Sequence, residues 1–173
     1  MFSNLEDEIK LLIEEEGRDL KFKIKDKVLP INYDCTPCIS YDYTFLQPNH
    51  EFSFLNSEIN NKTSEDFPFL SDAQIYFDRI QKICKSDFAS LCTDSFFFRI
   101  VSPNKNLKKV ADFIFSQKLQ PDQIPPFIEI LLYTNKKTEK APRVFGFIGN
   151  ASIIYILFYD PFHKIYNATG KVI

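Results

Sequence analysis

The stretch RVFGFIGNASIIYILFYD, residues 143–160, decides the fold expected for this chain. It reads as two apolar strands joined by a tight turn, because Gly149 and Asn150 both tolerate positive φ. A third apolar run, FIEILLYT at 127–134, precedes it across the polar loop NKKTEKAP. Three successive strands with a short second connection predict an antiparallel β-meander over residues 127–167. The last strand is apolar on both faces, which predicts a central place in the sheet under covering helices.

The rest of the chain supplies helices and a less regular segment. Apolar residues at helical spacing predict helices at 4–16, at 72–92 (ending in a short second helix at SDFASLC) and at 106–118. Capping-box patterns begin the first two, and Asn106 could cap the third. Residues 30–71 contain several prolines and scattered aromatics, which predicts an irregular covering region that packs on the core. We expect one α+β domain over 1–173, an antiparallel sheet with helices mainly on one face.

Composition excludes several functional classes. The chain has 173 residues, a formal net charge of −2 and 45% hydrophobic residues, which fits a globular protein and argues against a generally basic nucleic-acid binder. No apolar run is long enough for a membrane span, and the N-terminus is acidic, so we expect a cytoplasmic protein with no membrane partner. Only four glycines occur and no phosphate-binding loop motif is present, so we expect no cofactor.

Two of the four cysteines form a C-x-x-C motif, Cys35 and Cys38. Zinc would need a second ligand pair, and only Cys84 and Cys92 remain. A redox pair would need a following helix, whereas ISYDYTF looks extended. Structural thiols, zinc and redox chemistry therefore stay open, with structural thiols preferred and no metal site assigned.

Two groups of lysines are candidate nucleic-acid contacts. Lys21, Lys23 and Lys25 alternate along a predicted strand and share one face, where they could track a phosphate backbone or protect a sheet edge from aggregation. Lys136 and Lys137 lie in the loop that precedes the last hairpin. Each group also has the simpler interpretation of a solvated surface.

The candidate catalytic residues lie at one end of the predicted meander. In an antiparallel hairpin the start of one strand lies beside the end of the next, so Arg143 should meet His163, Lys164 and Tyr166. An imidazole, permanent cations and a phenol together can move protons and stabilise charge on a phosphate. The alternative is that Asp160 begins a turn, His163 is a surface residue and Tyr166 is a packed aromatic.

The stretch RVFGFIGNASIIYILFYDPFHKIY resembles the C-terminal meander of RelE/ParE-superfamily toxins. In that resemblance Arg143 matches the strand arginine, His163 or Lys164 the basic residue after the final strand, and Tyr166 the terminal tyrosine. Some members of that superfamily are ribosome-dependent endoribonucleases that act on mRNA and others poison gyrase, so the resemblance implies one of these two activities. This chain is longer and more acidic than those toxins, and it carries Glu129 where they have basic residues. The tail DPFHKIYN is also similar to small prokaryotic proteins of mobile elements and defence loci.

Two functions follow from these features. The first is a prokaryotic toxin-like or anti-phage defence protein that acts on RNA as a metal-independent endoribonuclease, with an antitoxin or other protein partner. The second is a non-enzymatic interaction subunit that binds a partner protein through the aromatic segments YDYTF and EFSFL.

Overall fold

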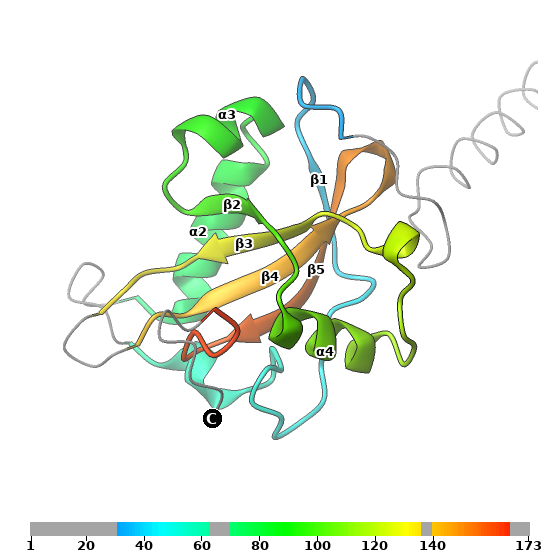
Figure 1. The fold of residues 1–173 in the computed structure, drawn as a ribbon. Coiled ribbons are helices and arrows are strands. Elements are labelled where there is room, and N and C mark those ends of the chain that lie inside the picture. The colour runs from blue at the N-terminus through cyan, green and yellow to red at the C-terminus, as the bar shows by residue number, and fades with distance from the viewer. Residues whose placement is uncertain (1–30, 63–69, 136–139, 167–173) are drawn as a thin grey trace, which may run out of the picture.

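The computed structural model of the chain describes residues 31–62, 70–135 and 140–166. The helix expected at 4–16 and the strand that carries Lys21, Lys23 and Lys25 lie outside these residues. The described part is an α+β fold built on one mixed, mostly antiparallel sheet (Figure 1).

The sheet has five strands in the order β1-β5-β4-β3-β2. The strands are β1 (Cys38–Ser40), β2 (Phe98–Val101), β3 (Phe127–Leu131), β4 (Arg143–Ile148) and β5 (Ile153–Asp160). Neighbours β3, β4 and β5 pair antiparallel in sequence order, which confirms the predicted meander. Strand β2 continues this order, since it pairs antiparallel with β3, and the sheet departs from a pure meander at β1, which pairs parallel with β5.

The turn between β4 and β5 differs from the predicted one. Gly149 has φ −94°, and positive φ occurs instead at Ala151 (55°) and Ser152 (60°), within the 3-10 turn Asn150–Ser152. The Gly149 N–H donates to the Ile153 carbonyl over 2.8 Å and closes the turn. The connection is therefore longer than a two-residue hairpin turn.

Three α-helices are described: α2 (Asp72–Ile83), α3 (Phe88–Asp94) and α4 (Lys105–Ile114). The predicted capping box of α2 is confirmed, since Ser71 and Gln74 each accept a hydrogen bond from the other's backbone N–H. Asp87 and Asn104 cap α3 and α4 through their side-chain oxygens, without the reciprocal hydrogen bond of a capping box. The predicted cap at Asn106 is wrong, because Asn106 lies within the first turn of α4.

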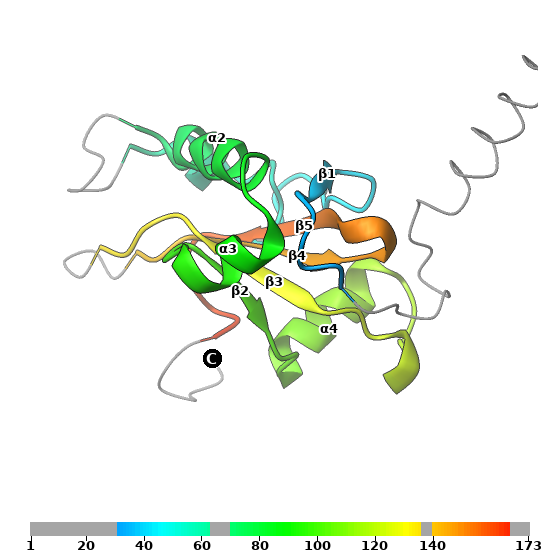
Figure 2. The ribbon, with the colours of Figure 1, turned by 90° about the horizontal axis from the view of Figure 1, so that it is seen from above.

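Helices lie on both faces of the sheet, as Figure 2 shows with the sheet between α2 and α4. Helices α2 and α3 contribute Ile75, Ile83, Phe88 and Leu91 to one core cluster, so two of the three described helices share a face as expected. Helix α4 packs Leu107 and Ala111 onto the opposite face. That face is also apolar, and α4 buries its side chains from water. They are Phe127, Phe145, Phe147, Tyr155 and Phe158.

The expected covering region is described over residues 31–62. Apart from β1 and the 3-10 helix η1 (Ser57–Asn60), it consists of turns and extended segments. It lies against β5, because the Phe45 N–H donates to the Leu157 carbonyl (2.7 Å) and the Tyr159 N–H to the Phe52 carbonyl (3.1 Å). Pairing with the backbone of β5 gives this irregular segment a defined place.

Candidate functional site

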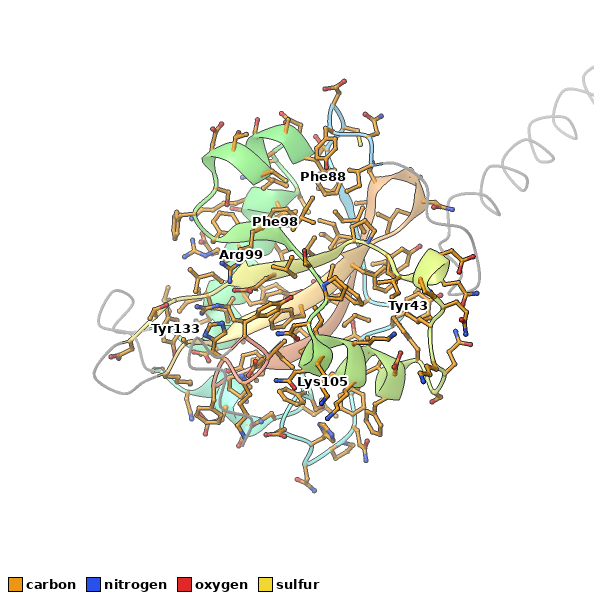
Figure 3. All side chains as sticks on the ribbon, in the orientation of Figure 1. Tyr43, Phe88, Phe98, Arg99, Lys105 and Tyr133 are labelled. Atoms are coloured by element: carbon orange, nitrogen blue, oxygen red, sulfur yellow. The ribbon has the colours of Figure 1, made fainter. Side chains whose placement is uncertain are left out.

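Strand register gathers charged residues at one end of the α4 face. Glu129 on β3 lies opposite Arg99 on β2, and Arg143 at the start of β4 lies opposite Asp160 at the end of β5. Directly opposed residues in antiparallel strands point to the same side of the sheet. Figure 3 labels Arg99 at the edge strand β2, and Glu129 shares a face with Phe145, which belongs to the core under α4.

Glu129 is the centre of this charge cluster. Its buried carboxylate, 2% exposed, accepts from Arg143 Nε over 2.8 Å and from Arg99 Nη2 over 2.9 and 3.1 Å. The guanidinium of Arg143 is also buried and donates through Nη1 to the carbonyls of Tyr133 and Pro142. Burial lowers the pKa of Arg143, against the opposing effect of the Glu129 charge.

The two arginines differ in access to solvent. The Arg143 side chain is 8% exposed, whereas that of Arg99 is 59% exposed. Arg99 therefore has donors free to meet an anionic ligand, while Arg143 supplies fixed positive charge from beneath.

Asp160 organises the turn that follows β5. Its carboxylate is fully buried and accepts from the backbone N–H groups of Phe162, Lys164 and Ile165 at 3.3, 3.0 and 3.0 Å. Burial raises the pKa of Asp160, although these hydrogen bonds and Arg143 favour the charged form. Asp160 is thus a turn residue, as the simpler interpretation of the sequence expected.

The turn places His163 beside the charge cluster. His163 has a left-handed backbone with φ 53°, and its half-buried ring has an Nε2 atom without a hydrogen-bond partner among the described residues. Burial lowers the pKa of His163, and the charge of Arg143 lowers it further, while Glu129 acts in the opposite sense. The lowered pKa favours the neutral imidazole, and its Nε2 atom is buried from solvent.

The side chains of the other two predicted catalytic residues, Tyr166 and Lys164, point to different parts of the structure. The Tyr166 ring stacks on Phe145 with centroids 6.1 Å apart, and its hydroxyl donates to the Ser102 carbonyl. Lys164 turns outward, where its Nζ lies 2.5 Å from a carboxylate oxygen of Glu51. The fold brings Arg143, His163 and Tyr166 to the α4 side of one sheet end, whereas the ammonium of Lys164 is engaged by the covering region.

A small pocket of about 80 Å³ opens at the cluster. Its lining residues are Phe96, Phe97, Arg99, Glu129, Leu131 and Arg143. The sequence interpretation missed Arg99, Phe96 and Phe97 as site residues, and it noted Glu129 only as a departure from the toxin pattern. The sequence does contain a signal for Glu129 and Arg99. Each is a single charged residue in an apolar strand, FIEILL or FFFRIV, and such residues are typical of charges that pair between neighbouring strands.

The opposite face carries a second polar cluster that sequence interpretation also missed. Asp72, at the start of α2, is fully buried and accepts from the hydroxyls of Tyr133 (2.7 Å) and Tyr159. The ammonium of Lys140 lies 3.2 Å from Asp72 and 3.4 Å from Glu58. This network anchors the N-terminus of α2 to the sheet, and burial raises the pKa of Tyr159 far above its usual value.

The cysteines do not form a metal centre within the part of the chain that the structure describes. All four are free thiols, and no group of three or more His, Cys, Asp or Glu side chains there could hold a metal ion. Cys38 begins β1, so the C-x-x-C motif leads into a strand, as expected, and not into the helix that redox motifs use.

The aromatic segments proposed as a partner surface pack mostly inward. Tyr43 contacts Phe147 and Tyr155, while Phe52 lies 5.7 Å from Phe158. Large exposed apolar side chains in these segments and between them are limited to Tyr41, Leu46 and Leu55. The predicted aromatic surface is therefore largely part of the core.

The lysine contacts predicted at 21, 23, 25, 136 and 137 lie outside the described residues.

Within residues 31–62, 70–135 and 140–166, no helix has the length and apolar character needed to cross a membrane. Comparison of the chain with protein-family models, curated proteins and solved structures gives no match.

Proposed function

We propose that this chain is a toxin-like or defence-associated protein that acts on RNA, as a metal-independent endoribonuclease centred on His163. The observation that carries the proposal is the Nε2 atom of His163, which is buried and without a hydrogen-bond partner among the described residues. It belongs to an imidazole held neutral beside two guanidiniums, one of them exposed.

This arrangement matches the needs of RNA cleavage without a metal. In the proposed reaction the buried Nε2 of His163 first becomes exposed to the substrate, and His163 then takes the proton of a ribose 2′ hydroxyl. The resulting oxygen attacks the adjacent phosphorus. The bond from phosphorus to the 5′ oxygen breaks and leaves a 2′,3′-cyclic phosphate. A lowered imidazole pKa keeps this base unprotonated at neutral pH.

The other residues have distinct roles in the proposal. Arg99 meets the non-bridging phosphate oxygens, because its guanidinium reaches solvent while Glu129 fixes one side of it. Arg143 is a positioning residue that holds Glu129 in place. Burial raises the pKa of Tyr166, so its hydroxyl stays protonated and is the candidate acid for the leaving 5′ oxygen, after release from Ser102.

The test is expression of the chain in bacteria, with growth as the readout. We expect arrest by the natural sequence and normal growth with His163→Asn, a residue that tolerates the left-handed backbone at this position. Lys164→Ala is the matched control, since Lys164 is its exposed neighbour and pairs with Glu51. Harmless expression of the natural sequence, with a protein partner co-purifying, would instead favour the non-enzymatic interaction subunit.

A further inference from the structure

Phe96 is an exposed aromatic side chain at the rim of the candidate pocket. It is 76% exposed, the highest value among the exposed large hydrophobic side chains of the described residues. It lies two residues before the start of β2 and lines the same pocket as Arg99 and Glu129. An exposed aromatic ring is ordinary by itself, and what distinguishes Phe96 is that it lines a pocket together with an exposed guanidinium.

The Phe96 ring is held in position by its neighbours. The guanidinium carbon of Arg79 lies 5.0 Å from the Phe96 centroid and 4.8 Å from that of Phe97. Phe96 and Phe97 meet edge to face at 84°, with centroids 5.7 Å apart. Arg79 is itself 2% exposed and donates to the Leu132 carbonyl over 3.2 Å. The ring is therefore supported from the protein side while most of its area faces solvent.

The pocket combines this aromatic ring with an exposed cation. Arg99 is three residues along the chain, and its guanidinium has free donors. Proteins that bind single-stranded nucleic acid combine aromatic rings, on which bases stack, with cations that follow the phosphates. A base inside a duplex is stacked on both faces by its neighbours, so only an unpaired base can lie on such a ring.

We infer that Phe96 is a stacking residue for one unpaired base, whose phosphate is bound by Arg99, and that the substrate is single-stranded RNA. This inference rests on the proposed action on RNA and adds the form of RNA that the site accepts. Phe96 sets specificity in this scheme and takes no part in proton transfer.

The chain contains no tryptophan, so the Phe96→Trp variant has a single fluorescent indole at the proposed stacking position. Titration uses a short 2′-O-methyl single strand, which cannot be cleaved through its 2′ oxygen, and the same sequence as a duplex. Phe77→Trp is the matched control, because Phe77 is 65% exposed on α2 and does not line the pocket. We expect quenching of the Phe96→Trp variant by the single strand, and little change with the duplex or with the control.

Affinity, measured by anisotropy of the labelled single strand, gives the second readout. Phe96→Ala should weaken binding by about tenfold, as expected for loss of one base–aromatic stack, and Phe77→Ala should not. Binding of the natural chain with neither quenching nor an effect of Phe96→Ala overturns the stacking role and leaves the proposed function in place. Stronger binding of the duplex also overturns it. Failure of the natural chain to bind either RNA overturns the proposed function as well.

Discussion

Replacement of Glu129 by glutamine tests the charge cluster on which the candidate site is built. The substitution keeps the shape of the side chain but removes the charge that lies between two guanidiniums. Arg143 would remain buried, at 8% exposure, with only the carbonyls of Tyr133 and Pro142 and a neutral amide oxygen as partners. A buried charge that loses its counter-ion is strongly destabilising.

The expected loss of stability depends on how deeply each arginine partner of Glu129 is buried. Breaking a buried ion pair lowers the free energy of unfolding by about 3–5 kcal/mol. We expect a loss of about 3 kcal/mol for Glu129→Gln, because Arg143 keeps its carbonyl partners. For a chain of this size that loss corresponds to a fall of roughly 6–12 °C in Tm. Arg99→Gln should cost less than about 1 kcal/mol, since that side chain is 59% exposed.

Urea denaturation followed by circular dichroism measures both variants. The double variant Glu129→Leu with Arg143→Met removes both charges of the buried pair and should recover part of the lost stability, while Asp160 loses the favourable charge of Arg143 and keeps its three backbone donors. Equal losses for Glu129→Gln and Arg99→Gln would refute the reasoning, as would a Glu129→Gln variant as stable as the natural chain.

Three further predictions concern the fold and its pH dependence. Gly146→Ala should lower stability by about 1–3 kcal/mol in a urea titration, because its Cβ would lie 2.5 Å from the Tyr155 carbonyl oxygen; an unchanged midpoint would contradict this close approach. Asp72→Ala should lower the free energy of unfolding by about 3–5 kcal/mol, because it removes the buried carboxylate that Lys140, Tyr133 and Tyr159 contact. Tyr133→Phe should lower it by only about 1 kcal/mol, and equal losses for the two variants would contradict a central role for the carboxylate. The folded state lowers the pKa of His163, so the unfolded chain takes up a proton first as pH falls through about 6.5 and stability declines there. His163→Asn should remove that part of the decline, and identical pH slopes for the two proteins would count against it.

The meander was predictable because its signals are local. Three apolar runs and the turn between the last two identify β3, β4 and β5, and topology alone then brings the start of β4 near the end of β5. The parallel pairing of β1 was not predictable, since its three residues show no period and their partner is more than a hundred residues away. The left-handed residues Ala151 and Ser152 were also missed, because neither residue type favours positive φ.

The candidate site could be predicted only in part for a similar reason. Arg143, His163 and Tyr166 lie at the same end of the sheet because of strand order, which the sequence pattern indicates. The engagement of Lys164 by Glu51 joins segments 113 residues apart, and no local pattern reports it. The pairing of Arg99 with Glu129 depends on register between β2 and β3, which is set by packing over the whole sheet.

The most direct test of the central claim is RNA cleavage by the purified chain in the presence of EDTA. A single-stranded RNA is the substrate, and the ends of the products are identified by mass spectrometry. The account predicts products ending in a 2′,3′-cyclic phosphate, formed by the natural chain and by Lys164→Ala and absent with His163→Asn. Intact RNA after incubation with the natural chain, or equal cleavage by the folded His163→Asn variant, would contradict it.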